Sequence, residues 1–291
     1  MSTMPAERPG AAAPVLSMRG VSKHFGAVAA LTDIDLDVYA GEVVALVGDN
    51  GAGKSTLVKI LSGVHPQDAG TVNFDGRDVN IQSPVDALNL GIATVFQDLA
   101  LCDNLSVVDN LFLGRELGPW RLNEGEMEVQ SWELLRQLSA KIPSVRIAVA
   151  SLSGGQRQTV AIARSLLGSP KLIILDEPTA ALGVAQTAEV LNLVERLREN
   201  GLAVIMISHN MQDVQAVSDR VAVLRLGRNN GTFRMKDVST DDLIAAITGA
   251  AVNVVTQRAA QAGTAGTLGK AGVPPVRPPE AAAAAEEGSV Q

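Results

Sequence analysis

The chain has 291 residues, of which 46% are hydrophobic, 19% are charged and only 3% are aromatic. Its net charge is −7 and it contains no long run of Lys or Arg, which argues against nucleic acid as the main partner. The single cysteine, Cys102, excludes an intramolecular disulfide and fits a reducing compartment. An aliphatic core with few aromatics is typical of buried parallel strands covered by helices.

The amino-terminal end shows no sign of membrane targeting. Residues 1–14 are rich in Ala and Pro and lack the apolar stretch of a secretory signal, so we expect a flexible leader. No segment approaches the roughly 18 consecutive apolar residues that span a bilayer. The sequence therefore predicts a protein that reaches a membrane only through another subunit.

A strand, a glycine-rich turn and a helix follow the leader. Residues 31–38 alternate apolar and polar side chains, and residues 43–47 form the continuous apolar run of a fully buried strand. Residues 48–55 match the phosphate-loop pattern G-x-x-x-x-G-K-[ST], and residues 56–62 have helical character. In such a loop, backbone N–H groups and a helix N-terminus surround phosphate oxygens.

The parts of this loop have predicted tasks in holding ATP. Lys54 is expected to reach the β- and γ-phosphates, and Ser55 to ligate Mg²⁺. A surface glycine turn before a helix is the alternative, and the buried strand ahead of the loop argues against it. The predicted nucleotide-binding residues are Gly48, Asp49, Asn50, Gly51, Ala52, Gly53, Lys54, Ser55 and Thr56.

Helical periodicity dominates from about residue 98 to residue 167, which predicts an inserted helical subdomain. Within it, a Leu-Ser-Gly-Gly-Gln segment at 152–156 precedes a predicted helix at 156–167. Ser153 and the two glycines can form a second anion-binding helix start, with a plain helix cap as the alternative.

An acid pair ends the next apolar run, residues 172–175. At the carboxyl end of a buried strand, Asp176 can hold Mg²⁺ through water because hard cations prefer oxygen ligands. Glu177 is placed to act as general base on an attacking water. Such a pair is often only a strand end or a helix cap, and its place downstream of a phosphate loop favours catalysis.

The rest of the chain completes the predicted architecture. Residues 203–207 and 221–226 are candidate buried strands, and residues 239–242 resemble a capping box opening a last helix that ends at Gly249. Helices alternating with apolar strands predict an α/β fold with a mixed, largely parallel sheet. With the phosphate loop at residues 48–55, this fold resembles a P-loop NTPase core to which the helical subdomain is added. Residues 251–291, rich in Pro and Ala, are expected to be a disordered tail.

The three motifs, in this order, resemble those of ABC transporter ATPases over about residues 15–250. In that family two cassettes pack head to tail, and each nucleotide lies between the phosphate loop of one chain and the signature of the other. The resemblance implies that a second copy of the chain holds ATP against the signature residues Ser153, Gly154, Gly155 and Gln156.

The resemblance also implies roles outside the three motifs. Gln97 corresponds to the Q-loop glutamine, which senses Mg²⁺ and water and touches the membrane subunit. His209 corresponds to the switch histidine that steadies the γ-phosphate, and Phe25 to the aromatic that stacks on adenine. The plain alternatives are a solvated glutamine, a satisfied histidine and a core phenylalanine. The implied catalytic residues are Glu177, His209 and Gln97, and the implied magnesium ligands are Ser55, Gln97 and Asp176.

One position departs from the family. Where an aspartate that communicates across the dimer is usual, this chain has Gly183. We expect an active ATPase with altered coupling between its two sites.

Residues 96–115 and 180–184 resemble the ATPases of bacterial monosaccharide importers of the ribose, xylose and fructose type. This implies a subunit that uses ATP and Mg²⁺ to power import through separate permease subunits, with a periplasmic or lipid-anchored solute-binding protein as an indirect partner. It also implies peripheral attachment to the cytoplasmic face of the cell membrane. The alternatives are another ABC importer or exporter, a soluble non-transport ABC ATPase, and a cassette that binds ATP without hydrolysing it. The last is disfavoured by Lys54, Asp176, Glu177 and His209.

Overall fold

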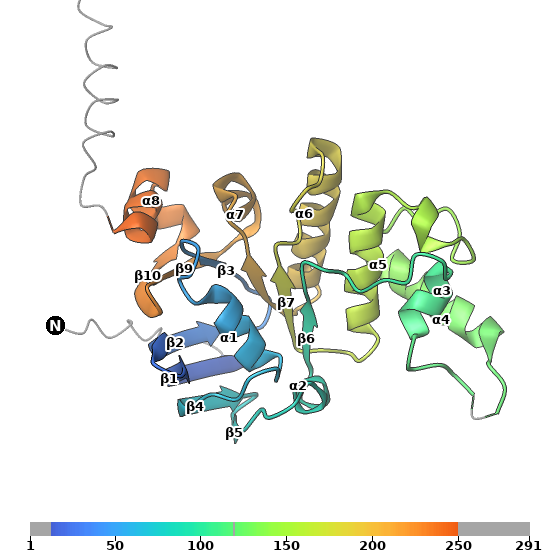
Figure 1. Cartoon of the computed structure of the whole chain (residues 1–291). Helices are drawn as coiled ribbons and strands as arrows, with labels where there is room; N and C mark the ends of the chain where they lie inside the picture. Colours follow the sequence, from blue (N-terminus) through green and yellow to red (C-terminus); the bar gives the residue numbers. More distant parts are fainter. Residues whose placement is uncertain (1–12, 119, 250–291) are drawn as a thin grey trace, which may run out of the picture. The chain divides into compact units, whose positions relative to one another are not determined.

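The computed structural model describes residues 13–118 and 120–249, which Figure 1 draws in colour. The predicted tail at 251–291 lies outside the described residues, as do residues 1–12 of the predicted leader. Within the described ranges, no helix is long and apolar enough to cross a membrane.

The smaller of two β-sheets is antiparallel, with the strand order β2-β1-β4-β5. The predicted strand at 31–38 belongs to it, and its buried and exposed side chains alternate because one face of the strand covers the core. The strands of this sheet are β1 (Leu16–Phe25), β2 (Val28–Val38), β4 (Ala69–Phe74) and β5 (Arg77–Val79).

The larger sheet has six strands in the order β10-β9-β3-β8-β7-β6. Its strands from β9 to β6 are parallel and β10 is antiparallel at the edge, which confirms the predicted mixed, largely parallel sheet. All residues of β3 and β8 are buried, as their unbroken apolar runs predict. The strands are β3 (Val43–Val47), β6 (Ile92–Val95), β7 (Leu172–Asp176), β8 (Ala203–Ile207), β9 (Arg220–Arg225) and β10 (Arg228–Arg234).

This sheet separates two hydrophobic cores, and β3 contributes to both. Val44 and Leu46 pack with side chains of β1, β2 and α1 (Lys54–Leu61). Val43, Ala45 and Val47 pack on the other face, in a core shared with α5 (Gly154–Leu166) and α6 (Val184–Glu199). Because side chains of a strand point alternately to the two faces, one apolar run serves two layers.

Three helices within the predicted subdomain, α3, α4 and α5, contact one another and lie to one side of β6 and β7 (Figure 1). Helix α5 also packs against α6. The further helices are α2 (Pro84–Leu90), α3 (Val107–Phe112), α4 (Glu124–Gln137), α5 (Gly154–Leu166), α6 (Val184–Glu199), α7 (Met211–Val217) and α8 (Thr240–Thr248), with 3₁₀ turns at Val149–Ser151 and Met235–Asp237.

Most predicted boundaries hold to within two residues, and two deserve comment. The Asp242 N–H donates to the Ser239 side chain and Gly249 ends α8 with φ of 71°, which confirms the predicted last helix. The predicted strand at 221–226 is wrong at its end. Leu226 is 77% exposed and has φ of 49°, so it belongs to the β9–β10 turn.

Candidate active site

The glycine-rich loop joins β3 to α1, and close packing dictates two of its glycines. Gly48 has φ of 154°, and a Cβ built on it would lie 2.2 Å from the carbonyl oxygen of Leu224 in β9. At Gly53, φ is 103° and a built Cβ would lie 2.5 Å from Cδ2 of Leu31 in β2. A larger residue at either position would displace a neighbouring strand. The fold therefore sets the loop geometry before a ligand binds.

Main-chain hydrogen bonds hold the middle of the loop. The Ala52 N–H donates to the carbonyl oxygen of Asp49 (3.0 Å), and the Ala52 carbonyl accepts from the Gly227 N–H (3.1 Å). Asn50 and Gly51 form the exposed tip. The predicted nucleotide-binding set thus lies on this loop and the first turn of α1: Gly48, Asp49, Asn50, Gly51, Ala52, Gly53, Lys54, Ser55 and Thr56.

The Lys54 ammonium folds back over the loop. Its Nζ donates to the carbonyl oxygens of Gly48 (2.7 Å) and Asp49 (3.1 Å). Burial lowers the pKa of Lys54, and nearby carboxylates, Glu177 first, oppose that shift. The first turn of α1 has no acidic residue and no side-chain cap. A polyphosphate would therefore meet a lysine and a positive helix end together.

Asp176 and Glu177 occupy the carboxyl end of β7, as predicted. Glu177 has a positive φ of 52°, a conformation that costs a non-glycine residue about 1–3 kcal/mol. Its N–H donates to the carbonyl oxygen of Ile207 at the end of β8 (3.0 Å), which helps to hold it. Burial raises the pKa of Asp176 and the Glu177 charge raises it further, whereas Lys54 and Lys59 lower it.

His209 follows β8 and lies against Glu177. Nδ1 of the imidazole is 2.6 Å from Oε2 of Glu177, and the histidine side chain is 74% exposed while that of Glu177 is 17% exposed. Because a carboxylate at this distance accepts a hydrogen bond, we assign the proton to Nδ1. The structure thus brings together two residues that the sequence predicts to be catalytic.

Two residues that the sequence analysis missed lie beside this pair. The Thr179 hydroxyl donates to Oδ2 of Asp213 at 2.6 Å, and Asp213 is buried in α7. The contact joins positions that no motif connects. The one sequence signal is an acidic residue on the apolar face of a helix, next to the buried Val214 and near the buried Val217.

Gln97 lies two residues beyond the end of β6 and is exposed. Because Val95 pairs with Leu175 of β7, Gln97 lies at the carboxyl ends of the parallel strands, as Glu177 does. Among the hydrogen bonds of the described residues, none joins Gln97 to either carboxylate of the acid pair. Its predicted role remains a prediction.

Phe25 ends β1 and is 44% exposed, so the plain core interpretation is wrong. Its ring meets the imidazole of His65 edge-on, with centroids 5.2 Å apart, and the Lys23 ammonium lies 5.6 Å from its centroid. Lys23 is in turn paired with Asp68 at 2.7 Å. The exposed ring is therefore held by its neighbours and has surface for stacking.

The Ser153 segment begins α5 and is packed against the start of α6. Ser153 caps the helix, exchanging hydrogen bonds with Gln156 at 3.3 and 3.0 Å, so the helix-cap interpretation holds here. A Cβ built on Gly154 would lie 2.8 Å from Cδ2 of Leu182, and one on Gly155 would lie 3.2 Å from Cβ of Gln186. Both glycines therefore lie close to the start of α6, and a larger residue at either would press on Leu182 or Gln186. Figure 1 shows α5 and α1 on opposite sides of β6 and β7, so one chain does not bring the two motifs together.

Gly183 is the N-cap residue of α6 and has φ of −73°, which any residue can adopt. A Cβ built there meets nothing within 4 Å. Its N–H donates to Oε1 of Gln186 at 3.4 Å. The backbone at this position does not require glycine, and an aspartate fits it.

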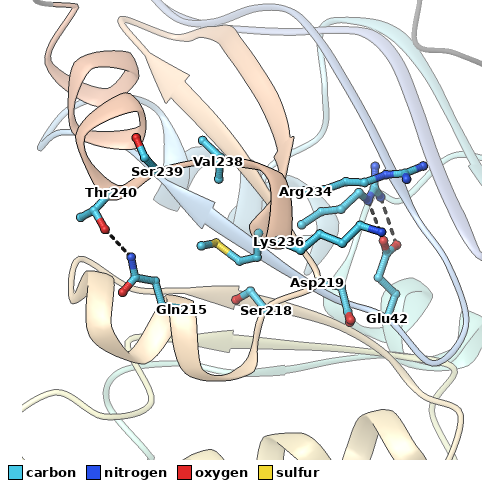
Figure 2. A pocket seen from close by; sticks show the side chains of 11 residues that line it. Glu42, Gln215, Ser218, Asp219, Arg234, Lys236, Val238, Ser239 and Thr240 are labelled. Atoms are coloured by element: carbon cyan, nitrogen blue, oxygen red, sulfur yellow. Dashed lines mark hydrogen bonds and ion pairs between the residues drawn. The ribbon is translucent and has the colours of Figure 1, made fainter.

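A separate cavity of about 1020 Å³ lies at the opposite ends of the strands, where β3 and β9 begin (Figure 2). The ion pair between Glu42 and Arg220 lines it, as does the hydrogen bond from Gln215 to Thr240 (2.6 Å). These contacts connect β3 with β9 and α7 with α8. This cavity contains none of the predicted site residues.

The chain is similar to known proteins over most of its length. The sequence profile of the ABC transporter family matches residues 31–180. The chain is 44% identical over 246 residues to a fructose import ATP-binding protein of Rhizobium meliloti, covering 81% of this chain and 95% of the relative. It is 41% identical to a ribose import ATP-binding protein of Escherichia coli O157:H7, covering 81% of this chain but only 47% of that relative.

Two solved structures are similar throughout their length. An ATP-binding cassette of an ABC transporter in its ADP conformation has a TM-score of 0.72 and 26% identity, covering 82% of this chain and all of the other. A dimeric cassette bound to ADP and Pi in a post-hydrolysis state has a TM-score of 0.63 and 26% identity, covering 76% of this chain and 98% of the other.

Proposed function

Because the chain belongs to the ABC transporter family and is an ATPase of that family, we propose that it powers the import of a monosaccharide through a separate membrane permease. One observation carries the proposal. The phosphate loop, His209 and Glu177 follow three adjacent parallel strands, β3, β8 and β7, with the last two side chains 2.6 Å apart. Open α/β sheets bind ligands at the carboxyl ends of their parallel strands. The relatives named for fructose and ribose import favour a sugar as the cargo.

In this proposal the loop amides, the α1 N-terminus and Lys54 bind the phosphates, and Phe25 stacks on adenine. The carbonyl contacts of Lys54 at 2.7 and 3.1 Å are ones that a γ-phosphate would replace with a charge-assisted bond. The exposed face of Phe25 supplies the apolar surface that a purine ring needs.

Glu177 is the proposed general base, which accepts a proton from the water that attacks the γ-phosphate. His209 donates to the carboxylate through Nδ1. To steady the phosphate in this proposal, Nε2 must also carry a proton and donate to a phosphate oxygen. We also propose Gln97, at the same sheet edge, as a ligand of that water.

The donor set at this edge fits Mg²⁺. The Ser55 hydroxyl, the Asp176 carboxylate and the Gln97 amide are oxygen donors, and Mg²⁺ is usually held by one or two carboxylates together with substrate phosphates and water. The raised pKa of Asp176 marks a carboxylate whose charge the protein does not fully balance. The ion, when bound, would neutralise charge on the phosphates.

We propose that two copies of the chain complete each other's sites. Residues 15–250 would form the cassette and residues 98–167 its helical subdomain, which presents Ser153, Gly154 and Gly155 to the partner's ATP. The dimeric cassette with ADP and Pi supports this arrangement. Glu177→Gln removes the base and keeps its shape, so we expect size-exclusion chromatography with ATP and Mg²⁺ to show a dimer. A Lys54→Ala, Glu177→Gln double variant should remain monomeric, and a monomeric single variant at saturating ATP would contradict the proposal.

The proposed partners are permease subunits at the cytoplasmic face of the membrane and, indirectly, a periplasmic or lipid-anchored solute-binding protein. Uptake of labelled fructose, ribose and xylose in the native host, with the gene deleted and then restored, tests the cargo. Loss of uptake of one sugar, regained with the wild-type gene and not with Glu177→Gln, is the expected result. Unchanged uptake of all monosaccharides alongside loss of another solute would contradict a sugar cargo and leave the ATPase assignment intact.

A further inference from the structure

Asp213 is a buried carboxylate whose two oxygens serve two different loops. It lies in the first turn of α7 and is 5% exposed. Oδ2 accepts a hydrogen bond from the Thr179 hydroxyl at 2.6 Å, and Oδ1 accepts one from Nδ2 of Asn210 at 3.1 Å. Burying a carboxylate costs free energy because the group loses its hydration, and hydrogen bonds within the protein must compensate that loss.

The two loops are those that carry the proposed hydrolytic residues. Thr179 is two residues after Glu177, and Asn210 directly follows His209. The loops therefore meet twice, once through the Glu177–His209 pair and once through the buried Asp213.

The hydrogen bonds of Asp213 help to fix the position of the Glu177–His209 pair. Glu177 has φ of 52°, and such a conformation persists only where the surroundings determine it. On one side the Glu177 N–H is bound to Ile207, and its carbonyl oxygen accepts from the Ala180 N–H at 3.1 Å. The bond from Thr179 to Asp213 anchors the turn between these two points.

We propose that Asp213 is a positioning residue for ATP hydrolysis, which acts through Thr179 and Asn210 to hold Glu177 and His209 in their paired geometry. The inference rests on the proposed function. Asp213 does not touch the nucleotide in this account, so its loss should slow the chemical step and leave ATP binding unchanged.

The test removes separately each of the two hydrogen bonds that Asp213 accepts, beginning with the one from Thr179. Thr179→Val deletes the hydroxyl and keeps the β-branched shape, and Thr179→Ser keeps the hydroxyl. We expect Thr179→Val to lower kcat about 10- to 100-fold, because small misplacement of catalytic groups has effects of that size. Thr179→Ser should stay within about threefold of wild type, and the Kd for ATP of both variants within about twofold.

A variant that removes the hydrogen bond from Asn210, together with a stability control, completes the test. Asn210→Ser retains an N-cap residue for α7 but lacks the amide that reaches Asp213, so it should also lower kcat selectively. Ser131→Ala removes a buried hydroxyl bond (2.7 Å to the Met127 carbonyl) in α4, away from the site, and should leave kcat unchanged. If Thr179→Val and Asn210→Ser keep wild-type kcat, or lose kcat only in proportion to a lowered melting temperature, Asp213 is not a positioning residue. A wild-type chain that hydrolyses no ATP would instead overturn the proposed function.

Discussion

The two ends of the parallel strands handle charge in opposite ways. At the amino ends, Arg220 donates to both oxygens of Glu42 (2.6 and 3.0 Å) and to the carbonyl oxygen of Asp37 (2.5 Å). Asp219 accepts from the Val43 N–H at 2.9 Å. The Arg220 and Glu42 side chains are only 16% and 10% exposed and satisfy each other within the fold, whereas Asp219 is exposed.

At the carboxyl ends the charges are less well compensated. The hydrogen bonds of Lys54 go to loop carbonyls, and burial lowers its pKa. Burial and a neighbouring carboxylate raise the pKa of Asp176, and Glu177 has a strained backbone. Charge that the fold balances serves structure, whereas charge that it leaves unbalanced at one edge marks a binding site. The following variants test this distinction.

The largest effect on stability is expected at the amino ends. Glu42→Ala leaves the half-buried Arg220 without its carboxylate, which should lower the free energy of unfolding by about 3 kcal/mol. Glu128→Ala, which breaks the exposed pair with Arg146, is the matched control and should cost less than about 1 kcal/mol. Denaturant unfolding measures both. Turnover per folded molecule should be unchanged in both, and a loss of turnover in Glu42→Ala would break the comparison.

A smaller effect, on ATP affinity, is expected at Phe25, where the adenine ring is proposed to stack. Phe25→Ala should weaken ATP binding about 3- to 10-fold, since an aromatic stacking pair contributes about 0.5–1.5 kcal/mol. Phe25→Tyr retains the ring and should bind as wild type does. Equilibrium binding of ATP measures the change. If Phe25→Ala binds ATP as tightly as wild type does, Phe25 does not contact the adenine ring.

Asp176 gives a pH-dependent prediction. Its folded-state pKa is raised, so the ionised carboxylate reduces stability at neutral pH, and this penalty fades as pH falls through the folded pKa towards the unfolded value of about 3.9. Asp176→Asn should therefore have a larger free energy of unfolding than wild type at pH 7 without nucleotide, by about 1 kcal/mol or less, and so a higher melting temperature. The difference should shrink as pH falls. A variant less stable at pH 7 would show that the protein balances this charge.

The smallest effect is expected at Gly183. Aspartate is a better N-cap than glycine by a few tenths of a kcal/mol, so Gly183→Asp should slightly raise the stability of the chain. Because a Cβ built there meets nothing within 4 Å among residues 13–118 and 120–249, we expect the aspartate to change the Hill coefficient for ATP more than the affinity. A tenfold loss of affinity with an unchanged Hill coefficient would contradict a role between the two sites.

Much of the site was predictable because its determinants are local. A buried apolar run, a glycine loop that only small residues can form, and the acids after Leu175 all fall within short segments of sequence. The last helix was predictable for the same reason, since Ser239 and Gly249 mark its ends.

What the sequence did not predict depends on contacts between distant positions. Strands β4, β5 and β10 are defined by their pairing partners. Gly154 lies against Leu182 of the next loop, and Asp213 gains its two hydrogen-bond partners only when Thr179 and Asn210 meet. The roles of Gln97 and the signature remain predictions because each depends on a ligand or on a second chain.

The central claim is that the unbalanced charge at the carboxyl ends becomes a working site when a second copy adds its signature. Mixing two inactive variants tests it directly. Lys54→Ala destroys the phosphate loop, and Ser153→Asp keeps the helix cap while placing a negative charge where the partner's phosphate would lie. Each variant alone should hydrolyse almost no ATP, and the mixture should recover activity because mixed dimers contain one intact site. If the mixture stays as inactive as its components, each chain does not complete the site of the other.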